Sequence, residues 1–256
     1  MSFDTRLVQG LCVTVAIGLF MPSVAAADVA PRFIFELEAG AVWQSRNNVE
    51  IPNDGTATRF SLKDLVGEGP WPAGRLYFTY NINSRHSLRG MVAPLSYTET
   101  GSFEEPVRFA GAEYLPGLPT EATYQFNSWR LGYRYTFVRG ERWIWRVGFT
   151  AKIRDAKIEL AQGATTSEDT DVGFVPLLHV SGDWRFAPSW RLMLDIEALA
   201  GGPGRAEDGS LKIGYDISSN GMLTVGYRIV EGGADVDEVY NFAWFNYPVV
   251  SGVYRF

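Results

Sequence analysis

The chain has 256 residues, of which 46% are hydrophobic, 14% aromatic and 20% charged, and this composition excludes a disordered protein. The formal net charge of −6 gives no indication of a nucleic-acid partner. One cysteine and two histidines exclude a disulfide framework and leave little room for metal ligands, so we expect no metal and no other cofactor. The 27 glycines and the aromatic content favour an all-β fold.

Residues 1–27 have the pattern of a secretory signal peptide. Residues 11–20 carry no charge, and three alanines, Ala25 to Ala27, precede Asp28. An apolar run of about ten residues is too short to cross roughly 30 Å of hydrocarbon as a helix. We therefore expect cleavage after Ala27, which leaves residues 28–256 as one exported, cysteine-free domain.

Apolar and polar side chains alternate with a period of two along most of the remaining chain, which predicts β-strands with two different faces. The alternation is regular in 33–44, 75–82, 128–137, 145–154, 174–186, 190–198, 211–217 and 223–229. It is less regular in 87–99 and 240–256, where Pro94 and Pro248 predict bulges. Together these segments predict about ten strands (roughly 8–12), because a further hairpin near 59–62 would raise the count.

Short and long connections alternate between the predicted strands. The short ones are 83–86, 139–142, 187–189 and 218–221, and the long ones are 47–74, 100–122, 160–171, 202–209 and 231–238. Short periplasmic turns and long extracellular loops are typical of transmembrane barrels. The sequence therefore predicts an all-β fold, a closed antiparallel transmembrane β-barrel.

The size of such a barrel indicates which face meets the lipid. A lumen enclosed by about ten strands is too narrow for the large aromatic face, so we expect that face outside and the polar face inside. Aromatic residues gather near predicted strand ends, where interfacial girdles belong. They are Trp43, Trp143, Trp145, Trp184, Trp190 and Tyr254. The alternative is a secreted, soluble, calycin-like barrel with its apolar face inward.

The chain ends with Gly252-Val253-Tyr254-Arg255-Phe256, an alternating last strand with an aromatic terminus. Over residues 32–256 it resembles the outer-membrane β-barrel proteins of Gram-negative bacteria as a class, without indicating one family. In those proteins a terminal motif of this kind is recognised by the barrel assembly machinery, although its usual glycine is displaced by one residue here. The resemblance implies that Tyr254 and Phe256 form the assembly signal, and that outer-membrane lipid and lipopolysaccharide surround the barrel.

Charged residues on the polar face predict a network across the lumen. They are Glu36, Glu38, Arg89, Arg130, Arg134, Arg146, Lys152, Arg154, Asp183, Asp195, Glu197, Asp216 and Arg228. One interpretation is a rigid plug of ion pairs. The other is a narrow, porin-like channel for small polar solutes.

Two further hypotheses remain beside a structural or channel protein. A turn near Pro188 would place His179 opposite Glu197 and Ser181 opposite Asp195, so a carboxylate could orient the histidine and the histidine could activate the serine. The segment 179–181 resembles the His-x-Ser motif of outer-membrane lipid A deacylases, although the acid spacing differs. We favour a non-enzymatic protein in which Glu197 satisfies His179. A third hypothesis is a surface-binding barrel acting through acidic loop segments such as 104–105, 168–171 and 235–238.

Overall fold

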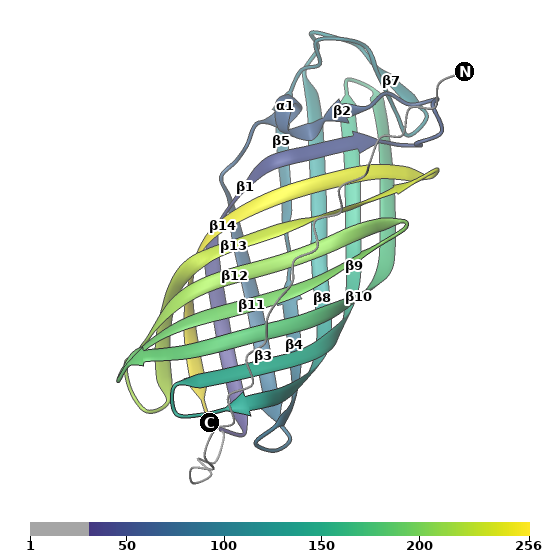
Figure 1. Ribbon diagram of the computed structural model, residues 1–256. Helices are drawn as coiled ribbons and strands as arrows, with labels where there is room; N and C mark the ends of the chain where they lie inside the picture. The colour runs from purple at the N-terminus through teal and green to yellow at the C-terminus, as the bar shows by residue number, and fades with distance from the viewer. Residues whose placement is uncertain (1–30) are drawn as a thin grey trace, which may run out of the picture.

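The computed structural model describes residues 31–256 (Figure 1). The expected signal peptide, residues 1–27, lies outside this range, so its cleavage site stays a prediction. Within residues 31–256, no helix combines the length and the apolar character needed to cross a bilayer.

The described chain forms a closed antiparallel β-barrel with ten strand positions, which confirms the predicted fold class. Strands β4 and β5 follow one another beside β8 and share one position, with Pro94 between them. Pairing of β14 with β1 closes the wall. The strands of the wall are β1 (Phe33–Glu50), β3 (Trp71–Asn81), β4 (His86–Ala93), β5 (Ser96–Gly101), β8 (Thr120–Arg139), β9 (Trp143–Gln162), β10 (Thr165–Ala187), β11 (Trp190–Gly201), β12 (Gly204–Asp216), β13 (Gly221–Val236) and β14 (Val239–Arg255).

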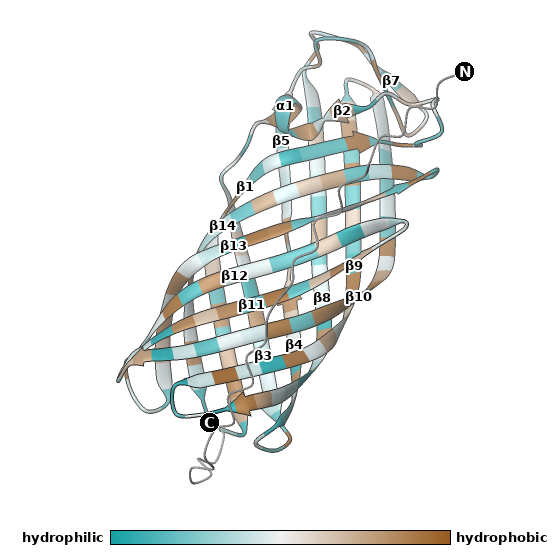
Figure 2. Ribbon diagram, in the orientation of Figure 1, coloured by the Kyte–Doolittle hydropathy of each residue, from teal (hydrophilic) through white to brown (hydrophobic). Residues whose placement is uncertain are grey.

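The two faces of the wall differ as the alternation predicts. On β8 and β9, Leu131 and Phe149 point outward with 60% and 61% of their surface exposed, whereas their neighbours Arg130 and Thr150 are buried inside. Figure 2 shows the same alternation of hydrophobic and hydrophilic residues along the ribbon of each strand. The apolar belt is thus the outer surface, and the soluble alternative with an apolar face inward does not describe this part of the barrel.

An aromatic row surrounds the end of the barrel where the short turns lie, which we call the turn end. Trp143 stacks on Trp184 with ring centroids 5.2 Å apart, and Trp190 lies 4.9 Å from Tyr215. Such rows occupy the membrane–water interface in transmembrane barrels. Trp43 was expected near a strand end but lies within β1, because β1 continues to Glu50.

Three of the five predicted long loops are instead mostly strand, so these predictions are wrong. Segments 160–171, 202–209 and 231–238 belong mostly to β9 to β14, and only residues 163–164, 202–203 and 237–238 connect the strands there. Their outward side chains become polar beyond the apolar belt, which obscured the alternation, but the backbone ladder continues. Above the belt the wall therefore projects as long hairpins.

The other two long connections, 51–70 and 102–119, form a cap over the opposite end, which we call the cap end. They contain β2 (Phe60–Ser61), α1 (Leu62–Val66), β6 (Val107–Phe109) and β7 (Ala112–Tyr114), so the suggested extra wall hairpin near 59–62 is absent from the described chain. Their apolar side chains fill the mouth of the barrel, including the fully buried Leu62, Phe109 and Tyr114. The interior at the cap end therefore contains a large apolar cluster beside a few buried polar groups such as Gln44 and Asn47, which corrects the expectation of a polar lumen throughout.

Polar contacts hold the cap in place. Tyr114 donates a hydrogen bond to the Leu160 carbonyl, at 2.9 Å, and the Arg59 guanidinium lies 3.6 Å from the centroid of the Tyr240 ring. On the outer side of the cap, Thr56 donates hydrogen bonds to the Asp54 carboxylate, which lowers the pKa of Asp54. These contacts join the cap to β9 on one side and to β14 on the other.

Candidate functional site: an ionic chain and a pocket above it

The interior near the middle of the barrel is crossed by a continuous chain of ion pairs, here called the ionic chain. It joins seven strands of the wall through five carboxylates and six cations, and the contact of Arg134 with Glu197 at 3.9 Å connects its two parts. Its members are Glu36, Glu38, Arg75, Arg89, Arg130, Arg134, Asp195, Glu197, Asp208, Lys212 and Arg228. A path of alternating charge thus runs across the whole lumen.

Two carboxylates are the branch points of the ionic chain. Asp208 lies 2.8 Å from both Arg75 and Arg130 and also accepts a hydrogen bond from Arg228. Glu38 binds Lys212 at 2.5 Å and Arg228 at 3.0 Å. Because these side chains are almost completely buried, each charge depends on its partners for stabilisation.

The chain reaches β11 through two further carboxylates. Glu197 lies 2.5 Å from Arg130 and accepts a hydrogen bond from Thr150 at 2.8 Å. Asp195 lies 2.7 Å from Arg89 and 3.3 Å from Arg134. Four strands, β4, β8, β9 and β11, are thereby connected through side chains as well as through the sheet.

Five of the predicted lumen charges lie outside the ionic chain. Asp183 and Asp216 form a separate group with Arg191 at the turn end, at 3.7 and 2.9 Å. Arg154 pairs with Asp171 nearer the cap. For Arg146 and Lys152, no carboxylate of the described residues lies within 4.0 Å.

Three members of the ionic chain were missed as site residues: Arg75, Asp208 and Lys212. Arg75 and Lys212 stand on the polar face in the sequence pattern, so the alternation places them inside the barrel but does not identify their partners. Asp208 lies in a segment that the sequence predicts to be a loop, whereas in the structure Asp208, Ser210 and Lys212 form one inward row of β12. That row is the signal that could have found it.

The His179 cluster has the expected register but different contacts. His179 lies opposite Glu197 and Ser181 opposite Asp195. Glu197 binds Arg130 and Thr150 and makes no hydrogen bond with the ring of His179. Neither ring nitrogen of His179 nor the Ser181 hydroxyl has a hydrogen-bond partner among residues 31–256, and Asp195 Oδ2 lies 3.5 Å from His179 Nε2. The expected hydrogen bond between His179 and Glu197 is therefore wrong.

This cluster offers little support for hydrolysis or metal binding. Ser181 and His179 are not hydrogen-bonded to each other, and both side chains are buried and line none of the three cavities described below. A histidine and two carboxylates do bring ligand atoms within 4.8 Å of one another. However, three arginines already hold those carboxylates, so a metal ion would meet strong positive charge.

The ionic chain leaves almost no free volume. The cavity beside Tyr77 and Glu197 measures about 10 Å³, and the cavity beside Arg75 and Tyr247 about 20 Å³. Each holds at most about one water molecule. The lumen of the described barrel is therefore sealed at this level.

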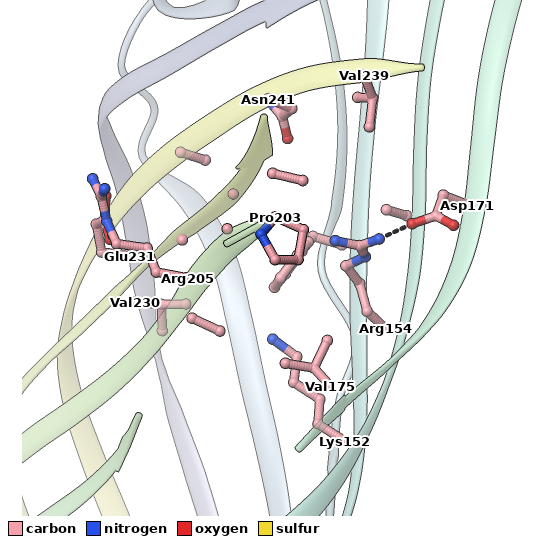
Figure 3. Close-up of a pocket in the computed structure, with 18 of the residues that line it drawn as sticks. Lys152, Arg154, Asp171, Val175, Pro203, Arg205, Val230, Glu231, Val239 and Asn241 are labelled. Atoms are coloured by element: carbon pink, nitrogen blue, oxygen red, sulfur yellow. Dashed lines mark hydrogen bonds and ion pairs between the residues drawn. The ribbon is translucent and has the colours of Figure 1, made fainter. Parts of the chain in front are cut away.

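A much larger cavity of about 460 Å³ lies between the ionic chain and the cap, and we call it the pocket (Figure 3). Phe126, Ile158, Val230 and Phe245 give it mainly apolar walls. Figure 3 shows Lys152 at its base, with the ammonium group directed into the cavity. The volume is in the range of small-molecule binding sites.

A closed antiparallel wall with an apolar belt, an aromatic row and a charged interior defines the class: the chain has the fold of the outer-membrane β-barrel proteins. No known family model matches it, and no curated protein sequence is similar to it.

Solved structures agree with this fold. The outer-membrane protease OmpT from Escherichia coli is similar over 90% of this chain and 99% of its own, with a TM-score of 0.52 and 11% identity. Ail of Yersinia pestis matches with a TM-score of 0.42 and 10% identity, over 88% and 99% of the two chains. Neisserial surface protein A gives 0.36 and 12%, over 87% and 97%. From the similarity to OmpT only the fold is inferred.

Proposed function

We propose that this protein is a barrel of the bacterial outer membrane that binds an apolar small molecule in the pocket and does not conduct ions through its lumen. The observation that carries the proposal is a pocket of about 460 Å³ directly above a lumen sealed by the ionic chain. Apolar walls with a few charged groups are the usual composition of a ligand site. The same proposal includes export by residues 1–27, insertion through a signal at Tyr254 and Phe256, and contact with lipopolysaccharide.

A binding experiment tests the pocket. The full mature barrel in lipid nanodiscs is titrated with an apolar fluorophore, and empty nanodiscs give the background. Ala156→Trp fills the pocket from β9, whereas Ala151→Trp places the same ring on the outer face of the same strand. We expect saturable binding that Ala156→Trp abolishes and Ala151→Trp preserves. Absence of binding by the wild type, or equal binding by both variants, would contradict the proposal.

A conductance experiment tests the seal. We expect planar bilayers containing the wild-type barrel to stay silent, because the ionic chain leaves no continuous path through the lumen. Discrete conductance that changes on neutralising Arg134 or Glu197 would favour the narrow-channel hypothesis. Deleting the acidic segment 104–105 distinguishes pocket binding from the surface-binding hypothesis. The deletion should leave fluorophore binding in the pocket unchanged, and loss of binding would favour the surface-binding hypothesis.

A further inference from the structure

The barrel wall is not paired along the full length of β10. Pairing with β11 ends at Leu178 and Ala198, whereas β10 continues to Thr165 along β9. Residues 165–177 therefore have one free edge in the described sheet. Beyond Ala198, residues 199–201 pair only with β12. We call this separation of β10 from β11 the seam.

Part of the seam lies within the apolar belt. Phe174 is paired with Ile153 and Pro176 with Ala151, and Ile153 and Ala151 face outward on β9. Phe174 is itself 65% exposed on the outer face. A strand edge exposed to hydrocarbon is costly, and a free edge at membrane depth is tolerated only where it is buried in protein or lines a water-filled cavity. Pro176, which lacks an N–H group, is a residue that edge strands accept.

Both sides of the seam line the pocket. Phe174, Val175 and Pro176 come from β10, and Leu199 and Pro203 from β11 and the turn that follows it. Since Phe174 and Pro176 also face outward, the pocket reaches the outer surface between these strands. Figure 3 shows Pro203 above Val175, both near the centre of the pocket view. The seam is therefore a side opening of the pocket at membrane level.

The floor of the pocket carries a buried amino group without a paired carboxylate. Lys152 is 3% exposed, its Nζ lies 4.6 Å from the centroid of the Phe126 ring, and no described carboxylate lies within 4.0 Å of it. The other three cations that line the pocket each have a carboxylate partner. Arg154 pairs with Asp171, Lys157 lies 2.6 Å from Glu159, and Arg205 binds Glu231 at 2.7 Å. A buried ammonium group in this setting is stabilised by an anionic ligand atom.

We propose that the seam is a lateral entrance from the surrounding lipid and that the pocket takes up a single-chain amphiphile whose acidic head group binds Lys152. The apolar walls hold the chain of this ligand, and the belt position of the seam gives it a path from the leaflet without passage through water. This inference rests on the proposed ligand-binding function and adds the ligand class and the route.

The head group is tested with laurate and dodecanol, which share a chain length and differ in charge. Binding is measured by displacement of the fluorophore from nanodisc-embedded protein. We expect Lys152→Met to weaken laurate binding about tenfold, the loss typical of one charge-assisted hydrogen bond, and to leave dodecanol within about twofold. The control Arg205→Met removes a pocket cation that already has a carboxylate partner, and it should change laurate binding little.

The outcomes of this experiment separate the two proposals. If neither compound binds, the proposed function fails. If both bind the wild type and Lys152→Met weakens both equally or neither, the pocket binds ligands but the acidic head group is wrong.

The route is tested by closing the seam. Leu177→Cys with Leu199→Cys places two thiols one residue beyond the last paired rung, and the mature chain has no other cysteine. The control pair, Val180→Cys with Ile196→Cys, joins a rung that is already paired. Transfer of a fluorescent fatty acid from vesicles is followed by stopped flow, with each cross-link verified by mass spectrometry. If the disulfide does not form, a short bifunctional maleimide joins the same thiols.

We expect the cross-linked seam to slow transfer at least about tenfold, and reduction of the disulfide to restore it, while the control pair has no effect. Unchanged transfer through a verified cross-link, with binding retained at equilibrium, would overturn the lateral route and place access at the cap end.

Discussion

Neutralising Asp208 is expected to destabilise the barrel more than neutralising any carboxylate at its rim. Asp208 is 3% exposed and contacts Arg75, Arg130 and Arg228. Removing one partner of a buried ion pair costs about 3–5 kcal/mol. Each of the three arginines keeps a second carboxylate, Glu197 or Glu38, so the loss for Asp208→Asn should lie near the lower limit, about 3 kcal/mol.

The assay is reversible urea unfolding in phospholipid vesicles, followed by tryptophan fluorescence. Asp216→Asn is the matched control, since Asp216 also binds arginines, Arg191 and Arg255, but lies at the solvated turn end. Its loss should be about 1 kcal/mol or less. If the two variants lose equal stability, or if Asp208→Asn loses less than about 1 kcal/mol, then the ionic chain does not stabilise the fold as argued.

Three other changes test separate parts of the molecule. Gly148→Ala should cost about 1–3 kcal/mol in the same unfolding assay, because its Cβ would lie 2.0 Å from the Tyr133 carbonyl oxygen, whereas Gly209→Ala meets no atom within 4 Å and serves as its control. Phe256→Ala should reduce the heat-modifiable, folded fraction in outer-membrane preparations if the terminal ring is the assembly signal, and equal folded fractions would contradict that role. Ser181→Ala should leave the lipid A mass spectrum of expressing cells identical to that of wild type, and a difference in acyl chains between the two would revive the hydrolase hypothesis.

The strands of the wall could be predicted from the sequence because each one is specified by the alternation of side chains within its own segment. Each strand must present apolar groups to lipid and polar groups to the lumen, so the alternation in 145–154 or 190–198 identifies both the strand and its faces. The ends of the strands could not be found in this way. Outside the belt both faces are polar, so the sequence pattern there predicts loops although the chain forms hairpins.

The contents of the barrel were much harder to predict. The pair of Arg75 with Asp208 joins residues 133 positions apart, and it depends on the registers of every strand between them. The cap residues Leu62 and Phe109 have no repeating pattern that would indicate burial in the barrel mouth. The seam depends on a difference in length between β10 and β11, which local alternation does not report.

The ionic chain and the seam lie at adjacent residue pairs of β10 and β11. The ionic chain therefore also limits how far these two strands separate. The pair of His179 with Glu197 lies directly below Leu178 with Ala198, the last rung before the seam. Glu197 is bound to Arg130 on β8 and to Thr150 on β9, and these bonds hold β11 toward the strands behind β10. Without the bonds of Glu197, further residue pairs of β10 and β11 toward the turn end would separate, and the seam would lengthen.

Glu197→Gln tests this role because it keeps the shape of the side chain and removes its charge. Losing a charge-assisted hydrogen bond of about 1.5–3 kcal/mol should speed amide hydrogen exchange roughly tenfold or more in peptides covering 178–184 and 192–198. Peptides from β13 and β14 should exchange at the wild-type rate. Asp183→Asn, which lies nearer the turn end, should leave the exchange rate of the amides beside Leu178 and Ala198 unchanged. Equal exchange in wild type and Glu197→Gln would show that backbone pairing alone stops the seam at Leu178, and that the ionic chain seals the lumen without restraining the wall.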